Sequence, residues 1–155
     1  MDRYVMTGLL KGKVAVVTGG SKGIGYSIAE RFTKEGAKVV VSSRNKEELE
    51  AAASMLGCDH FAVDVSDSKS ILSLKEWLVD THGSLDILVN CAGAVRYDGI
   101  MEATEEDWDF QISVNLTGTF LMCNKLAPIM NDGGAILNIS STLGLRAMKG
   151  AVAYC

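Results

Sequence analysis

A glycine-rich turn near the start of the chain has the residue types and spacing to bind a phosphate group: Thr18-Gly19-Gly20-Ser21-Lys22-Gly23-Ile24-Gly25. It follows an apolar run at 14–17 and precedes an amphipathic helical pattern, so its N–H groups would lie at a helix N-terminus. Gly19 allows a tight turn, Gly23 lets the backbone approach a pyrophosphate, and Gly25 lets the helix pack against the strand. The spacing differs from the G-x-G-x-x-G of other dinucleotide folds. We therefore predict a dinucleotide site, the alternative being a turn without a ligand.

The residues after the second expected strand carry a signal for the choice of dinucleotide. Folds that select NAD place an acidic residue there, which bonds the ribose 2′-hydroxyl. This chain instead reads Val41-Ser42-Ser43-Arg44-Asn45, with no acid. The planar guanidinium of Arg44 suits a 2′-phosphate, and Lys22 could add a second positive charge. NADP(H) is therefore the favoured cofactor and NAD(H) the alternative, while a purely structural interpretation makes both residues ordinary surface cations.

Strands and helices alternate along the chain, which indicates an α/β fold with a parallel sheet. The expected strands lie at 13–18, 37–43, 60–65, 85–90 and 135–140. Four helices are expected. The first follows the glycine-rich turn and ends near residue 35, and the second spans 46–56 after the N-cap Asn45. The third begins after Ser66 or Asp67, and the fourth runs from Thr104 to about Met130. Right-handed crossovers place helices on both faces of the sheet, which gives a doubly wound, three-layer α/β/α arrangement. Ligands bind beyond the carboxyl ends of such strands, where the motifs of this chain fall.

Length and composition fit one globular domain. The chain has 155 residues, and the proportions of 48% hydrophobic and 22% charged residues are typical of soluble proteins. A net charge of −4 with scattered basic residues argues against nucleic-acid binding. No apolar run approaches the ~18 residues of a membrane helix, and the N-terminus lacks the apolar core of a signal peptide. The four cysteines have no metal-binding spacing, so we predict no metal site and a reducing, cytoplasmic location.

Six segments, in order, resemble the short-chain dehydrogenase/reductase family. Besides the glycine-rich turn, they are Asp64-Val65, Asn90-Cys91-Ala92-Gly93, Asn115 in the long helix, Ile136-Leu137-Asn138-Ile139-Ser140-Ser141, and Tyr154. The family usually reads N-N-A-G where this chain has Cys91, and a small side chain still fits there. The resemblance spans essentially the whole chain. It implies a Rossmann-like oxidoreductase that moves a hydride between a nicotinamide and a small-molecule carbonyl or alcohol substrate.

The resemblance implies catalytic roles for three residues. Tyr154 would be the general acid for reduction, or the base for oxidation. Ser141 would bond and orient the substrate carbonyl, and Asn115 would hold a water molecule in a proton relay. Each residue also has an ordinary structural interpretation, as a half-buried aromatic, a turn former and a solvent-facing polar residue.

The resemblance also implies contacts with the cofactor. Asp64 would bond the adenine amino group, while Asn90 and Gly93 would stabilise the sheet edge and admit the adenosine ribose. The predicted cofactor-binding residues are Thr18, Gly19, Ser21, Lys22, Gly23, Ile24, Gly25, Ser43, Arg44, Asp64, Val65, Asn90, Ala92 and Gly93.

The family's Y-x-x-x-K signature is incomplete in this sequence, because the lysine would stand at position 158 and the sequence ends at Cys155. Such a lysine, about 4 Å away, would lower the ordinary tyrosine pKa of about 10 by roughly three units. The domain at 1–155 is therefore expected to be incomplete at its C-terminal end. The sequence could be the ordered part of a longer enzyme, a fragment of one, or a non-catalytic dinucleotide-binding or assembly module. The first two are favoured, because domain boundaries normally fall in exposed linkers.

Truncation would also leave an exposed edge. The strand expected at 135–139 carries no charge and no proline to discourage pairing with another chain. The long helix would lose cover around Phe110, Leu121 and Leu126. Full-length members of the family are commonly dimers or tetramers built through this helix and the one that bears the tyrosine. We therefore expect a homo-oligomer, and we expect the bare chain not to be a stable monomer.

Overall fold

Five parallel strands form one sheet in a computed structural model that describes residues 8–155. They are β1 (Val14–Thr18), β2 (Lys38–Ser42), β3 (Asp59–His60), β4 (Leu85–Asn90) and β5 (Met130–Asn138), in the order β3-β2-β1-β4-β5. The chain builds outward from β1 to β3 and then crosses to the other side of β1 to form β4. The strand order therefore reverses between β1 and β4, as in a doubly wound sheet.

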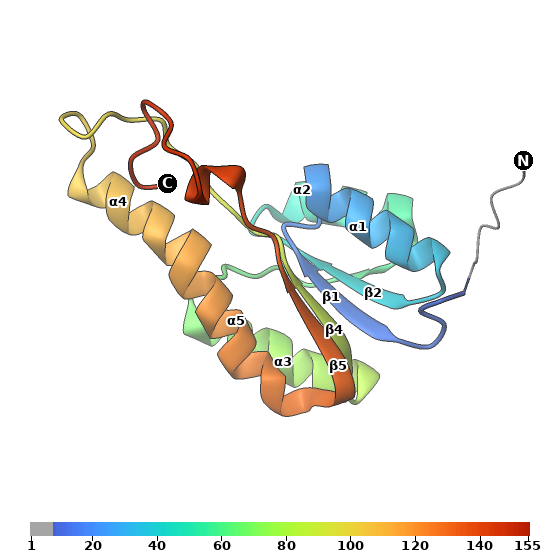
Figure 1. Cartoon of the computed structure of the whole chain (residues 1–155). Helices are drawn as coiled ribbons and strands as arrows, with labels where there is room; N and C mark the ends of the chain where they lie inside the picture. The colour runs from blue at the N-terminus through green and yellow to red at the C-terminus, as the bar shows by residue number, and fades with distance from the viewer. Residues whose placement is uncertain (1–7) are drawn as a thin grey trace, which may run out of the picture.

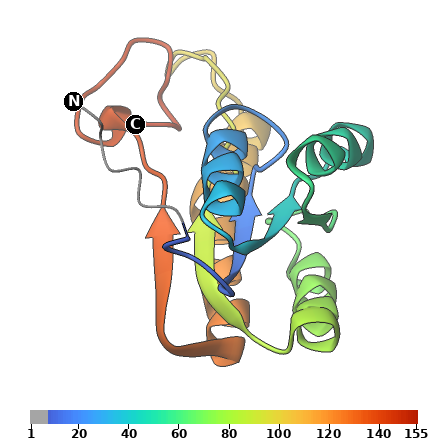
Figure 2. The same cartoon turned by 90° about the vertical axis from the view of Figure 1, so that its right-hand side faces the viewer.

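Helices cover both faces of this sheet (Figures 1 and 2). α1 (Gly23–Lys34) and α2 (Lys46–Leu56) pack on one face, and α3 (Ser68–His82) and α5 (Gly118–Leu126) pack on the other. α4 (Glu105–Ile112) continues the line of α5 beyond the end of the sheet (Figure 1). The predicted three-layer α/β/α fold is thus confirmed. Within residues 8–155, no helix is both long and apolar enough to span a membrane.

The sheet is buried on both faces, which explains the unbroken apolar runs in the sequence. Val14 and Val16 of β1 belong to the core under α3 and α5. Ala15 and Val17 alternate with them and belong to the core under α1 and α2. Because every residue of such a strand faces one core or the other, its apolar run marks its bounds well.

The helices α2, α3 and α4 are capped by the residues that the sequence predicts. The side chains of Asn45, Asp67 and Thr104 accept hydrogen bonds from backbone N–H groups in the first turns of α2, α3 and α4. Gly57 ends α2 in the left-handed conformation, with φ of 64°. These residues therefore begin and end their helices as predicted.

Three elements differ from the prediction. The strand expected at 60–65 is regular only at Asp59–His60, although two further amide bonds continue toward β2. β5 begins at Met130 rather than 135, because Met130 already pairs with Leu85 of β4 before the register shift that precedes the pair Ile87–Ala135. The long helix is interrupted by a π-helical segment, Ser113–Thr117, and closes with a 3-10 turn, Ala127–Ile129.

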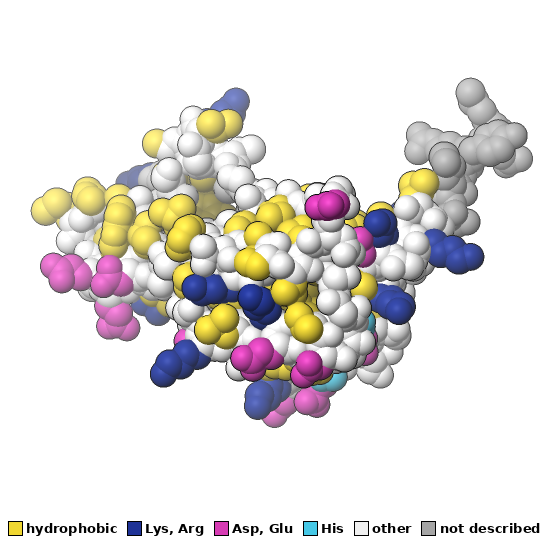
Figure 3. Space-filling view, turned by 90° about the horizontal axis from the view of Figure 1, so that it is seen from below, with side chains coloured by type: hydrophobic (Ala, Val, Ile, Leu, Met, Phe, Trp, Pro, Cys, Tyr) yellow, Lys and Arg dark blue, Asp and Glu magenta, His cyan; other side chains and the backbone are white. Residues whose placement is uncertain are grey.

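β5 is an edge of the described sheet (Figure 2). Its side chains are largely exposed, including 41% of both Ile136 and Leu137. The long helix also presents Trp108, Leu116 and Phe120 to solvent. Figure 3 shows exposed hydrophobic side chains toward the end of the molecule that carries α4, beside a group of acidic ones. Exposed apolar side chains of this kind are suited to protein contacts, and the homo-oligomer stays a prediction.

A buried carboxylate joins three strands at the amino-terminal edge of the sheet. Asp86 accepts hydrogen bonds from the Val14 amide at 2.9 Å, Lys13 Nζ at 3.0 Å and Asn131 Nδ2 at 3.1 Å. Burial opposes ionisation of this group, but these donors outweigh it and hold the pKa of Asp86 below its ordinary value. The ionised carboxylate therefore contributes to stability at neutral pH, and the contribution is lost as pH falls through this lowered pKa.

We expect Asp86→Asn to lower the free energy of unfolding at neutral pH by about 1–3 kcal/mol, because buried donors lose a charged acceptor. The difference from the unmodified protein should shrink below the ordinary aspartate pKa of about 3.9, as Asp86 itself becomes protonated. Denaturant titrations of the full-length natural protein across this pH range would measure it. Asp80→Asn, on the exposed surface of α3, is the matched control. An unchanged difference at low pH would contradict the assigned role.

Candidate active site

The carboxyl ends of β1, β2 and β4 bring the predicted motifs to one edge of the sheet. The glycine-rich turn follows β1, Ser43 and Arg44 follow β2, and the loop at 91–103 follows β4. The C-terminal segment lies at the same end of the molecule (Figures 1 and 2). This edge includes the point between β1 and β4 at which the strand order reverses, where ligands of such sheets bind.

The glycines of the turn have distinct steric environments. Gly19 has φ of 65°, and a Cβ at this position would lie 2.8 Å from the Cys91 carbonyl oxygen. At Gly25, a Cβ would overlap the Gly19 carbonyl group. Gly23 has φ of 59°, and its Cβ would meet nothing within 4 Å. Gly19 and Gly25 thus permit close backbone packing, whereas Gly23 faces open space.

The N-terminus of α1 fits a pyrophosphate. Its N-cap residue, Lys22, makes no side-chain capping bond, and its first turn has no acidic residue. α2, α3 and α4 are all capped by a side-chain oxygen instead. The positive end of the α1 dipole is therefore not neutralised by a capping oxygen or an acidic side chain. Ser21 and Ile24 lie in the same turn, and Ile24 is exposed.

Thr18 and Asn90 hold the strand ends together. Thr18 Oγ1 accepts hydrogen bonds from the amides of Cys91 and Ala92, both at 3.0 Å. Asn90 Nδ2 donates to Asn138 Oδ1 at 2.8 Å, which joins β4 to β5. These bonds fix the start of the loop that carries Ala92 and Gly93.

Cys91 is half-buried behind the turn. Burial raises the pKa of its thiol, and the Gly25 amide partly offsets this. Burial and the neighbouring Asp59 likewise raise the pKa of Cys58 to about 11. Both thiols therefore remain protonated at neutral pH, which makes them poor nucleophiles.

A cavity of about 270 Å³ lies beside the end of β2. Arg44, Ala62, Val63 and Asp64 line it. Asp64 Oδ1 accepts hydrogen bonds from the amide of Ser66 at 2.9 Å and from its hydroxyl at 2.6 Å. Asp64 Oδ2 has no such partner within residues 8–155. The lining thus includes an aspartate and an arginine, whose carboxylate and guanidinium are the groups that adenine and a 2′-phosphate would need.

Other predicted contact residues near this cavity are already engaged. Lys22 Nζ lies 3.2 Å from a carboxylate oxygen of Glu48, so its charge is partly neutralised. The Ser43 hydroxyl donates to the Asn45 carbonyl at 3.3 Å. Val65 is buried against Gly118, where a Cβ would lie 2.8 Å from Val65 Cγ2. Gly118 was not predicted from the sequence, because only the folded chain brings α5 against Val65.

Asn115 clamps the loop that follows β4. Its Oδ1 accepts from the Ala94 amide and its Nδ2 donates to the Ala94 carbonyl, both at 2.8 Å. The residue lies in the π-helical segment. Its side chain thus orders the loop behind Gly93, and the water-holding role stays a prediction.

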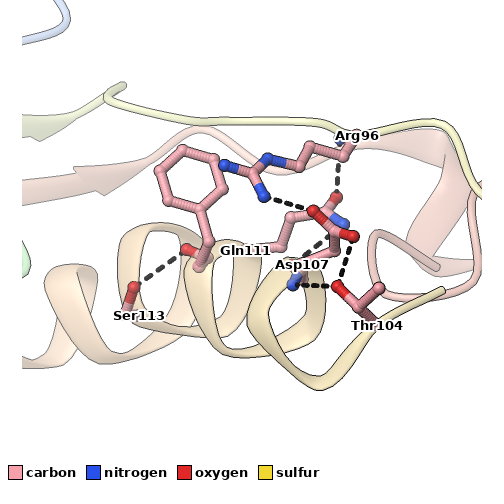
Figure 4. Close-up of polar contacts among 6 residues, drawn as sticks. Arg96, Thr104, Asp107, Gln111 and Ser113 are labelled. Carbon is pink, nitrogen blue, oxygen red and sulfur yellow. Dashed lines mark hydrogen bonds and ion pairs between the residues drawn. The ribbon is translucent and has the colours of Figure 1, made fainter.

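A polar cluster next to Asn115 was missed by sequence reasoning (Figure 4). The Arg96 amide donates to Gln111 Oε1 at 3.0 Å, and its guanidinium donates to Asp107. Hydrogen bonds from the Thr104 hydroxyl and from Arg96 lower the pKa of Asp107. The available signal was the four-residue spacing of Asp107, Gln111 and Asn115, which places them along one side of a helix.

Ser141 and Tyr154 lie in the segment that follows β5. Ser141 Oγ accepts from the Leu143 amide at 3.1 Å and caps a short 3-10 turn, Thr142–Gly144. Tyr154 is half-buried, and its amide donates to the Ala151 carbonyl at 3.1 Å. Within residues 8–155, no hydrogen bond joins the side chains of Asn115, Ser141 and Tyr154. The structure therefore brings the segments of the predicted cofactor-binding residues to one edge of the sheet, but it does not join the three predicted catalytic side chains.

Related proteins share both the sequence and the fold. D-threitol dehydrogenase from Mycolicibacterium smegmatis is 40% identical over 94% of this chain, which covers 59% of that protein. A 3-oxoacyl-(acyl-carrier-protein) reductase from Chlamydia trachomatis is 37% identical over 96% of this chain, which covers 63% of that protein. The chain thus spans about three-fifths of the length of these curated relatives.

Solved structures of short-chain dehydrogenases have the same fold as this chain. A short chain dehydrogenase from Mycobacterium smegmatis superposes with a TM-score of 0.92 at 31% identity, over 99% of this chain and 68% of that one. A short-chain dehydrogenase/reductase from Brucella melitensis, described as glucose/ribitol dehydrogenase, has a TM-score of 0.92 at 28% identity, over 96% and 65%. The sequence profile of the family described as short chain dehydrogenase matches residues 13–155. The chain therefore belongs to the short-chain dehydrogenase family.

Proposed function

We propose that the protein is an NADP(H)-dependent oxidoreductase that transfers a hydride between the nicotinamide and a carbonyl or alcohol group of a small molecule. The observation that carries this proposal is the uncapped N-terminus of α1 beside Gly23, at the edge where the strand order reverses. Membership of a family of oxidoreductases supports the reaction class. The names of the dehydrogenase and the reductase among the relatives support the same class.

Three side chains would handle the substrate while the bound nicotinamide supplies or accepts the hydride. Tyr154 would transfer the proton, Ser141 would hold the carbonyl oxygen, and Asn115 would support proton relay. The clamp that Asn115 forms on Ala94 gives it a second role, in shaping the loop beside the nucleotide.

The test is turnover by the full-length natural protein. It should consume NADPH in the presence of at least one member of a broad ketone and aldehyde panel, followed by the loss of reduced-nicotinamide absorbance. The alternative is a non-catalytic dinucleotide-binding module, which would bind NADPH without turnover. Binding without reduction across the panel would favour the module, and failure to bind either NADPH or NADH would overturn both.

NADPH should bind more tightly than NADH. A charge-assisted contact between Arg44 and the 2′-phosphate contributes about 1.5–3 kcal/mol, which corresponds to roughly 10- to 150-fold in dissociation constant. Arg44→Asp should remove or reverse the preference, as measured by equilibrium titration with both dinucleotides. Lys69→Asp makes the same change of charge on exposed α3 and should leave the ratio unaltered. Equal affinities in the unmodified protein would contradict the assignment.

We also propose that the protein forms a homo-oligomer and lies in the cytoplasm. The exposed apolar residues of the long helix and the edge strand β5 support a homo-oligomer, a dimer or a tetramer. The four cysteines form no disulfide, which supports a reducing, cytoplasmic location.

A further inference from the structure

Arg44 is held in place by an aromatic ring. Its guanidinium carbon lies 5.7 Å from the centroid of the Phe110 ring, within the range of a cation–π contact. The residue is exposed, and no carboxylate or hydrogen-bond acceptor within residues 8–155 pairs with its side chain. The contact with Phe110 therefore orients the guanidinium while leaving its N–H donors free.

The Phe110 ring is itself fixed by its surroundings. It is half-buried and packs against the core that lies under α3 and α5. The guanidinium carbon of Arg96 lies 4.3 Å from the same ring centroid. Asp107 and the rest of the cluster in Figure 4 anchor Arg96 in turn. The ring thus links the loop after β4 to the residue after β2.

The two arginines around this ring differ in their electrostatic state. Arg96 is paired with Asp107, so its charge is compensated. Arg44 has no such partner and lines the cavity that also contains Asp64. A guanidinium can lie against an aromatic ring and still present its in-plane donors to a phosphate. The uncompensated charge is therefore the one at the nucleotide cavity.

We propose that Phe110 is a positioning residue for recognition of the ribose 2′-phosphate, because its ring holds the guanidinium of Arg44, which lines the cavity beside the end of β2. This inference rests on the proposed function, since it assumes that Arg44 meets the 2′-phosphate of NADP(H). Phe110 itself does not bond the phosphate. It reduces the conformational freedom that Arg44 loses when the phosphate binds.

The expected effect is specific to the phosphate. Loss of a cation–π contact near the surface should weaken NADPH binding by about two- to fivefold. NADH lacks the 2′-phosphate, so its dissociation constant should change little. A purely structural role for Phe110 would weaken both dinucleotides together.

Equilibrium titration of the full-length natural protein with NADPH and NADH tests this inference. Phe110→Leu, or Phe110→Met if the leucine variant does not fold, should lower the NADPH preference by about two- to fivefold. Phe110→Tyr keeps the ring and should restore the preference. In the Arg44→Ala background, Phe110→Leu should have no further effect on the preference.

The outcomes separate the inference from the proposed function. If Arg44→Ala leaves the NADPH preference unchanged, the assigned 2′-phosphate site is wrong. If Arg44→Ala lowers the preference but Phe110→Leu does not, or if Phe110→Leu weakens both dinucleotides equally, the positioning role of Phe110 is overturned.

Discussion

Replacement of Tyr154 by Phe in the full-length natural protein is expected to lower kcat/KM for carbonyl reduction by about 10²- to 10⁴-fold, the usual contribution of general acid–base catalysis. The change removes the one hydroxyl proposed to give its proton to the carbonyl oxygen and keeps the aromatic ring. Binding of NADPH should be unaffected, because Tyr154 is proposed to act on the substrate. Steady-state kinetics on a substrate of the panel and a separate NADPH titration would measure both effects.

Tyr97→Phe is the matched control for that experiment. Tyr97 lies in the loop after β4, is 66% exposed, and makes no side-chain hydrogen bond within residues 8–155. The same loss of a hydroxyl there should leave kcat/KM within about twofold, as is usual for exposed positions without a role. If reduction by the Tyr154 variant persists unchanged, Tyr154 is not the proton donor.

The parts of the fold that the sequence predicted well are those governed by local rules. β4 was predicted at 85–90 and spans Leu85–Asn90, because burial on both faces produces an apolar run with clear ends. Helix starts followed from Asn45 and Asp67, whose side chains bond amides only two or three residues away. Such short-range hydrogen bonds depend on adjacent sequence alone.

The parts that were missed depend on residues far apart in the sequence. The early start of β5 reflects pairing of Met130 with Leu85, across a register shift that no local pattern announces. Lys22 appeared available for a phosphate, but folding places it beside Glu48. The partners of Asn115 are backbone atoms of Ala94, which carry no signature in the sequence. Side-chain types thus located the site, while tertiary packing decides which of those side chains are already engaged.

Gly25→Ala should have the largest effect of any substitution in the glycine-rich turn. The added Cβ would overlap the Gly19 carbonyl, so the start of α1 must move away from β1. Overpacking of this kind costs about 1–3 kcal/mol of stability. Each amide–phosphate hydrogen bond lost through this movement should weaken dinucleotide binding by roughly 10- to 150-fold. Thermal unfolding and titration with NADPH would measure the two effects.

Gly23→Ala and Gly57→Ala together separate strain in the chain from loss of the ligand site. Both glycines have left-handed φ values, 59° and 64°, and a Cβ at either position meets nothing within 4 Å. Each substitution should therefore cost a similar amount of stability, about 1–2 kcal/mol, from backbone strain alone. This strain lowers the stability of both variants and does not by itself change the affinity of the folded protein for a ligand. Only Gly23 lies where the pyrophosphate is proposed to approach the backbone, so only its alanine variant should bind NADPH more weakly. If the two variants bind NADPH equally well, the open space at Gly23 does not hold the phosphates. The proposed position of the dinucleotide is then wrong. A loss of binding in Gly25→Ala would not rescue it, because that substitution distorts α1.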